Sequence, residues 1–360
     1  MKVVLVGGGT MGPVSPLLAV ADYLQNAHLP VEFLFVGTKN GPEQRVVENA
    51  KINFVAIFAG KLRRYWSLAN FFAPFLFFAG LVHAFILLLK FKPTCVFGAG
   101  GFVQVPVIYA AWVLRIPVII HQQDVDVTLS NSLCAPFATK ITVSFEHSMR
   151  DFSQGLGFFK SPHTKIVWTG NPVRESLGTS HREEAVQFFH LDSTVPTVLI
   201  TGGSSGAYKL NELIAQALPE LLKVAQIIHT VGVNGTISQK FERYHPYTFI
   251  DRMDLALSVA DAVVSRAGMS AISELSLTRK PSIVIPMPDT HQESNAALLW
   301  NQKAAVVLDQ TTLTSQELVS EIHKLLLDGQ RREELSKNIH ELMPEHATKN
   351  IALIIEELHS

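Results

Sequence analysis

The feature that most constrains the fold is a pattern that occurs twice: an apolar run, a glycine-rich turn and a helical segment. Residues 3–6 lead into GGGTMG at 7–12, and residues 197–201 lead into GGSSGA at 202–207. Nearly continuous apolar runs are typical of parallel strands covered on both faces. Because 360 residues are many for one core, we predict an α/β protein with two Rossmann-like, doubly wound domains and a cleft between them.

Strands and helices alternate through both halves, which predicts open parallel sheets. In the first half we predict helices at 14–27, 41–50, 75–91 and 104–114, and strands at 3–6, 31–36, 94–97, 118–120 and 141–143. In the second half a helix begins at Leu210, and we predict strands at 197–201, 226–231, 247–250, 261–265, 282–285 and 305–307. The expected domains are 1–168 and 169–345, followed by a C-terminal helix within 346–360 that could pack back on the first domain.

The composition excludes several classes of protein. The formal net charge is −1, so nothing in the overall charge favours nucleic acid as a partner. Cys95 and Cys134 lie in apolar surroundings without a CxxC pair, which argues against disulfides or a zinc site and fits a reducing cytoplasm. The N-terminal apolar run is short and leads directly into a glycine turn, so it is predicted to be a strand and not a targeting segment.

The segment FFAPFLFFAGLVHAFILLL at 71–89 is apolar all round and has one ionisable side chain, His83. A helix of this kind is either buried or in contact with lipid. Three alternatives stay open: a membrane span, an ordinary buried helix, and a helix that dips into the membrane surface. The basic residues Lys61, Arg63 and Arg64 favour the third, because cations attract anionic head groups. We therefore expect residues 61–91 to bind an anionic membrane surface.

The glycine turns indicate phosphate or sugar ligands. In GGSSGA at 202–207, backbone amides and the Ser204 hydroxyl can hold a diphosphate at a positive helix end. The turn lacks the GK[ST] ending of a P-loop, which argues against ATP or GTP hydrolysis. The first turn, at 7–12, is not GxGxxG and no acidic residue ends the second strand, which argues against a dinucleotide site. GAGG at 98–101 is a second turn in the first half and favours a substrate cleft.

Three further segments place polar side chains after predicted strands. RAGMSAISE at 266–274 brings Glu274 to a helix start, where it either caps the helix or accepts both hydroxyls of a ribose. HQQD at 121–124 offers its histidine and its aspartate as general bases, although a histidine beside an apolar strand is more often a structural residue. HQESN at 291–295 is rich in amides, which suit sugar hydroxyls.

Taken together, these segments resemble the MurG family, the bacterial N-acetylglucosaminyltransferases that make lipid II from lipid I in peptidoglycan synthesis. The resemblance covers nearly the whole chain in order. Its motifs are GGGT-G-P--P at 7–16, GKLRRY at 60–65, GAGGFVQVP at 98–106, HQQD at 121–124, TGNPVR at 169–174, GGSSGA at 202–207, FIDRM at 249–253, ADAVVSRAGMSAISE at 260–274 and HQESNA at 291–296.

The resemblance implies a GT-B fold and an inverting glycosyltransferase that needs neither metal nor cofactor. Its donor, UDP-GlcNAc, would be held mainly by the second domain. By position in the motifs, Glu274 would bind the ribose hydroxyls, Ser204 the diphosphate and Gln292 the GlcNAc, and the Ile250 backbone would meet the uracil. The same pocket would be lined by Met269, Ser270, Ala271, Ile272 and Ser273. Arg174 would lie near the diphosphate.

The acceptor that the resemblance implies is lipid I, undecaprenyl-pyrophosphoryl-MurNAc-pentapeptide. Its C4 hydroxyl would attack C1 of the donor sugar, which Thr10, Met11, Gly12 and Asp124 would approach from the first domain. The family acts peripherally at the cytoplasmic face of the inner (plasma) membrane. It serves cell wall biogenesis, and with it cell shape, cell division and the cell cycle.

The chain departs from the family pattern in the first domain. The family's GGTGGH ends here on Gly12 and Pro13, with Met11 in place of a glycine, and its HEQN reads HQQD at 121–124. Proline has neither a base nor a backbone donor. Three hypotheses follow: Asp124 serves as the base, the acceptor is another lipid or sugar, or the protein binds a sugar nucleotide without catalysis. An epimerase of the same fold would need carboxylates on both sides of the sugar.

Overall fold

The computed structural model describes residues 1–39, 41–60, 69–155, 162–179, 181–203, 207–232, 235 and 241–359, with the backbone alone at 69–73. The chain forms two compact units, of which one comprises Met1–Arg174 and Met343–Ser360 and the other Glu175–Leu342. The first unit continues past residue 168 because the amides of Thr169 and Gly170 donate to the Val143 carbonyl. The chain leaves this unit only after Arg174.

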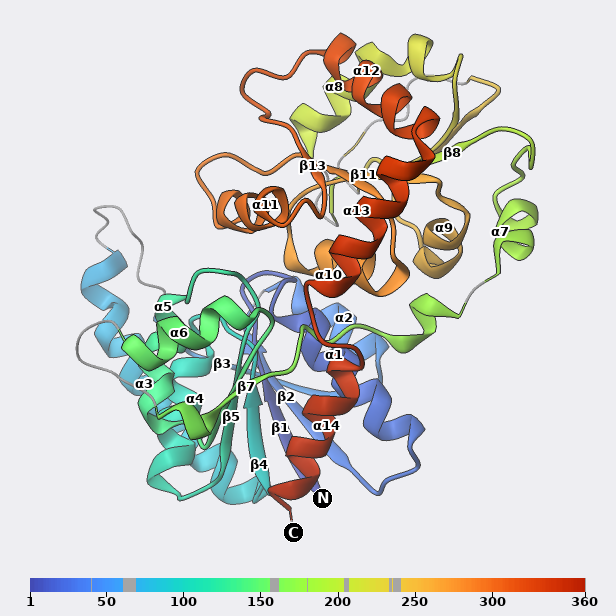
Figure 1. Cartoon of the computed structure of the whole chain (residues 1–360). Coiled ribbons are helices and arrows are strands. Elements are labelled where there is room, and N and C mark those ends of the chain that lie inside the picture. The colour runs from blue at the N-terminus through green and yellow to red at the C-terminus, as the bar shows by residue number, and fades with distance from the viewer. Residues whose placement is uncertain are drawn as a thin grey trace. The chain divides into compact units, whose positions relative to one another are not determined.

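The first unit is built on one parallel sheet (Figure 1). Among its described residues, seven strands pair in the order β3-β2-β1-β4-β5-β6-β7. Their bounds are β1 Lys2–Val6, β2 Glu32–Thr38, β3 Asn53–Ile57, β4 Cys95–Gly98, β5 Val118–Gln122, β6 Lys140–Val143 and β7 Ile166–Trp168. The sequence order reverses between β1 and β4, and ligands of open α/β sheets bind at the carboxyl ends of strands beside such a reversal.

Side chains of β1 point alternately into two cores, as the pleat of a strand requires. Val3 and Leu5 enter the core closed by α1 Val14–Asn26, α2 Glu43–Asn49 and α14 Ala347–Glu357. Val4 and Val6 enter the core closed by α3 Ala69–Phe91, α4 Gln104–Val113, α5 Leu129–Cys134 and α6 Glu146–Gln154. Figure 1 shows these two sets of helices on opposite sides of the sheet. Short 3-10 turns occupy Ala135–Phe137 and His163–Lys165.

The second unit repeats the architecture. Its described strands pair in parallel in the order β10-β9-β8-β11-β12-β13. Their bounds are β8 Thr197–Thr201, β9 Gln226–Thr230, β10 Tyr244–Tyr247, β11 Ala262–Ser265, β12 Ser282–Val284 and β13 Val306–Val307. A 3-10 turn at Glu175–Gly178 precedes the helices α7 Arg182–Phe188, α8 Tyr208–Leu221, α9 Met253–Val259, α10 Met269–Thr278, α11 Gln292–Asn301, α12 Ser315–Leu327 and α13 Gly329–Glu341. One core lies between the sheet and helices α8 and α12.

The predicted α/β class with two parallel-sheet domains is confirmed. The strand predicted at 247–250 is wrong, because the structure has β10 at Tyr244–Tyr247. Pro246 lies inside this strand, which is tolerated because β10 is at the edge of its sheet,. Strands β3 and β7 were absent from the sequence prediction. Cys95 and Cys134 are buried free thiols.

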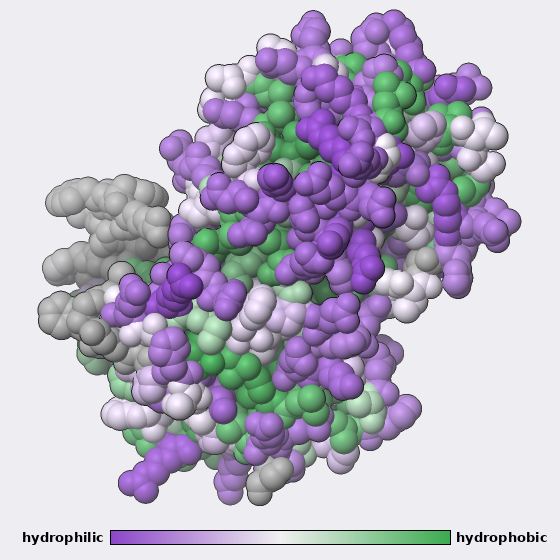
Figure 2. All heavy atoms as spheres, in the orientation of Figure 1, coloured by the Kyte–Doolittle hydropathy of each residue, from purple (hydrophilic) through white to green (hydrophobic). Residues whose placement is uncertain are grey.

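Helix α3 contains the apolar segment 71–89. One of its faces is buried and the other is exposed, although both are apolar. Ala84 and Leu88 are buried against the sheet. Phe75, Phe78 and Val82 are exposed by 68%, 63% and 59%. Soluble proteins rarely expose several large apolar side chains next to one another. Green atoms show at the left edge of the first unit in Figure 2, beneath the grey ones, where Figure 1 draws α3. An ordinary buried helix is therefore the wrong interpretation of this segment.

Candidate functional site

The two glycine turns of the first unit lie against each other. They follow β1 and β4, which are neighbours in the sheet. Gly101 has a φ of +86°, and a Cβ there would lie 2.5 Å from the Gly8 carbonyl oxygen. A Cβ on Gly9 would lie 2.9 Å from the Phe102 ring. The glycines therefore let two backbones approach at the carboxyl edge of the sheet, where a ligand is expected.

The tip of the first turn is accessible. Thr10 and Gly12 are exposed and Met11 is half-buried. Pro13 is the N-cap of α1 in a helical conformation, and no side chain caps this helix. Proline near the start of a helix fits, because the first amides of a helix have no partner within it. The proline that replaces the family's histidine is thus locally compatible with the fold.

His121, one of the two candidate bases of HQQD, is a structural residue. It is fully buried on β5, where its Nδ1 lies 2.9 Å from the Thr142 hydroxyl and its Nε2 2.9 Å from Asn171 Oδ1. Burial lowers the pKa of His121 to about 4, although the bonds to Asn171 and Thr142 act in the opposite direction. A side chain that is neutral and enclosed in this way cannot reach a substrate hydroxyl.

We expect the folded protein to lose stability as the pH falls from 6.5 to about 4. Burial lowers the pKa of His121 and of His229 from 6.5 to about 4, so within this window the unfolded chain binds protons that the folded chain does not. The loss is on the order of 3 kcal/mol for each histidine. Urea unfolding at pH 7, 5.5 and 4.5 measures it, and a His121→Asn variant should show a shallower dependence. A flat profile over this range would contradict the assignment.

Gln122, which stands where the family motif has glutamate, is committed to the fold. Its Nε2 donates to the Asp124 carbonyl at 2.9 Å and to the Asp126 carbonyl at 2.7 Å. Its Oε1 accepts from Asn131 Nδ2 at 2.7 Å and from the Thr128 amide at 3.3 Å. A carboxylate has no donor to offer the two carbonyls. The amide therefore positions the loop that carries Asp124.

Buried amides join HQQD to the second glycine turn. The Gly100 amide donates to Gln104 Oε1 at 2.9 Å, and Gln104 Nε2 donates to Asn131 Oδ1 at 2.6 Å. Gln123 Nε2 donates to the Ala99 carbonyl at 2.9 Å. The turns after β1, β4 and β5 therefore form one hydrogen-bonded and packed edge. Asp124 lies half-buried on it.

A carboxylate that sequence reasoning missed lies beneath this edge. Glu43 is buried, and its Oε1 accepts from the amides of Gly9 and Thr38 at 3.3 and 2.7 Å. The first-half motifs indicated Asp124 as the candidate carboxylate. Glu43 is distant from the first turn along the chain, so spacing alone could not place it there.

In the second unit, the segment predicted to bind the donor follows β11 and forms the start of α10. Met269, Ile272 and Ser273 are buried, and the Ser273 hydroxyl donates to the Met269 carbonyl at 2.7 Å. Ser270, Ala271 and Glu274 are half-buried in the first turns of α10. This helix starts at the carboxyl end of a central strand, so its first amides and its dipole favour an anion there.

The other predicted donor residues of this unit lie on neighbouring loops. Ile250 is buried in the loop between β10 and α9. Gln292 begins α11, and its Oε1 accepts from the Met287 amide at 3.0 Å. Asn295 Nδ2 donates to the Ala267 carbonyl at 3.0 Å, which ties α11 to the turn before α10. Ser204 lies outside the described residues, and Arg174 is exposed at the end of the first unit.

Arg266, just before α10, joins three neighbouring loops of the second unit. This buried guanidinium donates to the carbonyls of Ile285 and Pro286 at 3.0 and 3.4 Å and to Gln310 Oε1 at 2.5 Å. Burial lowers its pKa. It thereby connects the loops that follow β11, β12 and β13. In the described part of the chain, no group of three His, Cys, Asp or Glu side chains is arranged to hold a metal ion.

Comparisons with known proteins decide the family. The glycosyltransferase family 28 N-terminal domain matches residues 3–143, and the family 28 C-terminal domain matches 197–356. A Flavobacterium psychrophilum protein named UDP-N-acetylglucosamine--N-acetylmuramyl-(pentapeptide) pyrophosphoryl-undecaprenol N-acetylglucosamine transferase is 37% identical over 97% of this chain and 95% of its own. The chain belongs to the MurG family of glycosyltransferase family 28. A Bacillus thuringiensis MurG-family relative, transferase 3 of that name, is 35% identical over 90% of this chain and 91% of its own.

Solved structures agree with the MurG assignment. The crystal structure of Acinetobacter baumannii MurG superposes with a TM-score of 0.74 at 26% identity and covers 99% of both chains. The Neisseria meningitidis UDP-GlcNAc 2-epimerase has a TM-score of 0.69 at 17% identity and covers 99% of this chain and all of its own; this likeness shows the fold alone. The chain is a glycosyltransferase with the GT-B fold, as the MurG motifs predicted.

Proposed function

We propose that this MurG-family protein transfers GlcNAc from UDP-GlcNAc to the C4 hydroxyl of undecaprenyl-linked lipid I and so makes lipid II for peptidoglycan. The observation that carries the proposal is the match to transferases of this name over nearly the whole chain. The arrangement of α10 supports the donor half of the proposal. The packed edge after β1, β4 and β5 supports an acceptor site in the first unit.

For the donor, we propose that Glu274 accepts the two ribose hydroxyls, because a carboxylate has the paired acceptor oxygens that this contact needs. Ser204 and the start of α8 bind the diphosphate, and the Ile250 backbone meets the uracil. Residues 269–273 line the pocket, and Gln292 contacts the sugar. Arg174 and the helix dipole stabilise the charge that develops on the departing UDP.

For the acceptor half, we propose that Asp124 is the general base. It takes the proton of the C4 hydroxyl while that oxygen attacks C1 of the donor sugar in line and inverts it. Thr10, Met11 and Gly12 approach the sugar from the first turn. His121 is enclosed and Gln122 is an amide with four hydrogen bonds, so Asp124 is the side chain of this motif with both the chemistry and the accessibility for the task.

The test is an assay with UDP-GlcNAc and lipid I, with UDP release and lipid II formation measured together. Wild-type protein should form lipid II, and Asp124→Asn should lower kcat by about 100-fold or more, since a general base contributes about that much. Asp126→Asn, two residues along the same loop, is the matched control and should stay close to wild type. UDP binding without turnover on any lipid-linked acceptor would instead indicate a non-catalytic homologue, and preference for another acceptor would indicate a different substrate.

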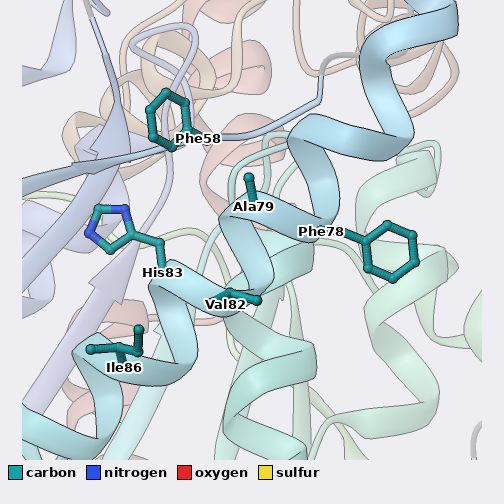
Figure 3. Close-up of a pocket in the computed structure, with 6 residues that line it drawn as sticks. All are labelled: Phe58, Phe78, Ala79, Val82, His83 and Ile86. Carbon is teal, nitrogen blue, oxygen red and sulfur yellow. The ribbon is translucent and has the colours of Figure 1, made fainter.

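We propose further that the outer face of α3 holds the protein on the cytoplasmic leaflet of the plasma membrane as a peripheral protein. Five of its exposed large side chains lie three or four residues apart, namely Phe75, Phe78, Val82, Ile86 and Leu89, and Leu76 is exposed beside them. Figure 3 shows Phe58, Phe78, Ala79, Val82, His83 and Ile86 around a shallow hollow of about 550 Å³ on this face. A stripe of this spacing fits an interfacial helix.

A full membrane span is the less suitable interpretation of α3. By length and composition, Pro74–Phe91 could cross a membrane. However, the helix lies between β3 and β4 along the chain, packs on α4, and buries Ala84 and Leu88 in the core of the first unit. Lys61, Arg63 and Arg64, which would add attraction to anionic lipid, lie outside the described residues.

A triple variant, Phe75→Ser, Phe78→Ser and Val82→Ser, tests the membrane proposal. It should weaken binding to vesicles containing anionic phospholipid by at least about 100-fold. That loss needs about 2.7 kcal/mol from all three changes together, and full burial of one large apolar side chain is worth up to about 1.5–3 kcal/mol. Leu353→Ser, an exposed change on α14 of the same unit, serves as control. Co-sedimentation measures both, and unchanged binding of the triple variant would rule out this face.

A further inference from the structure

Glu43 lies at the start of α2, and its carboxylate is enclosed within the first unit. It is fully buried, and one oxygen, Oε1, accepts three hydrogen bonds: from the Gly9 amide at 3.3 Å, the Thr38 amide at 2.7 Å and the Thr38 hydroxyl at 2.5 Å. These donors come from the turn after β1 and from the end of β2. One side chain therefore joins two strand ends of the first sheet.

Glycines surround this carboxylate closely. A Cβ on Gly8 would collide with Oε1, one on Gly41 would collide with Oε2, and one on Gly37 would lie 3.2 Å from Cγ. The second oxygen, Oε2, is buried without a hydrogen-bond partner among the described residues. Burying a polar oxygen without a hydrogen-bond partner costs free energy. Full enclosure also excludes direct contact with a substrate.

Glu43 acts on more than the first turn. Gly8, which covers it, is in backbone contact with Gly101 of the second turn, and Gly9 packs on the Phe102 ring. The second turn is in turn bonded to Gln104, which belongs to the amide chain leading to the loop of Asp124. A shift of the first turn would therefore move the surface that receives the acceptor.

We infer that Glu43 is a positioning residue for glycosyl transfer: it fixes the turn at 7–12, and through it the turn at 98–101, in the geometry that receives the acceptor. The inference rests on the proposed function. Its acceptor oxygen Oε1, and not its charge, is the functional atom. Because UDP is proposed to bind in the second unit, loss of Glu43 affects turnover and leaves UDP binding unchanged.

Three variants test this. Glu43→Gln keeps an oxygen at the Oε1 position and should retain kcat within about threefold, whereas Glu43→Asp withdraws it and Glu43→Ala removes it. Both of these should lower kcat by about 10- to 100-fold, the range expected when reacting groups are displaced by about 1 Å. UDP affinity by calorimetry should stay within about twofold in all three. Amide exchange by mass spectrometry should quicken at 7–12 and 98–104 in the Asp and Ala variants only.

Glu48→Gln, an exposed change on the same helix, is the matched control and should resemble wild type in every measurement. Wild-type kcat and exchange in Glu43→Ala would overturn the inference. So would a Gln variant as slow as the Ala variant with wild-type exchange, since that outcome assigns the effect to charge. If the Ala variant does not fold, the Asp and Gln variants decide. If wild-type protein transfers no GlcNAc, the proposed function fails, and the exchange comparison alone tests the positioning.

Discussion

A Glu274→Ala variant is expected to bind UDP-GlcNAc about 100- to 10,000-fold more weakly than wild type. Two hydrogen bonds from ribose hydroxyls to a carboxylate are worth about 1.5–3 kcal/mol each. Glu274 lies in the second turn of α10, half-buried, at the carboxyl end of β11. Titration calorimetry with UDP measures the effect without any acceptor, so it separates donor binding from turnover.

Two companion variants sharpen this prediction. Glu274→Gln retains one acceptor oxygen and should fall between wild type and Glu274→Ala. Glu341→Ala, whose carboxylate is exposed and 3.9 Å from Lys337, is the control in the same unit and should bind UDP as wild type does. If Glu274 only stabilises α10, its loss would lower the unfolding midpoint and leave UDP affinity unchanged.

Gln122→Glu should destabilise the first unit by about 3 kcal/mol although it restores the residue of the family motif. The change removes the donor to the Asp124 and Asp126 carbonyls and places a carboxylate against both oxygens in a buried site. Breaking buried hydrogen bonds and burying an unpaired charge costs about that much. Urea unfolding of the two proteins at pH 7 measures the difference.

The sign of the pH dependence gives this second prediction a distinct signature. Protonation would restore a donor to the new side chain, so the deficit of the variant should shrink as the pH falls. Gln44→Glu changes an exposed amide on α2 that donates to Glu48 at the surface, and it should show no comparable deficit. Equal stability of Gln122→Glu and wild type at pH 7 would mean that the loop rearranges to supply donors.

The strands that sequence predicted best are those with uninterrupted apolar runs. β8 was predicted at its observed bounds, and the ends of β1, β4, β6, β9, β11, β12 and β13 were predicted to within one residue. β7 has only 3 residues and ends on the exposed Trp168. β10 contains Pro246 and polar side chains. Neither has the long apolar run of a buried strand. Sheet pairing, rather than local preference, makes these segments strands.

The candidate site was predictable where function depends on a local motif and hidden where it depends on tertiary contacts. Glycine turns at strand ends marked both ligand edges. The contribution of Glu43 could not be seen, because its partner Gly9 is 34 positions away. The amide network of Gln122 likewise needs the loop to be folded. For α3, both faces are apolar, so composition could not say which one is buried.

The return of the chain to the first unit affects how the protein can be made. Ile351, Ala352, Ile354 and Ile355 of α14 fill the core over α1 and β1, and the Val173 amide bonds to the Thr348 hydroxyl at 3.1 Å. During translation, at about 5–20 residues per second, the second unit leaves the ribosome complete while the first still lacks this helix. The apolar core of the first unit over α1 and β1 therefore stays partly exposed until α14 has been synthesised and packs on it.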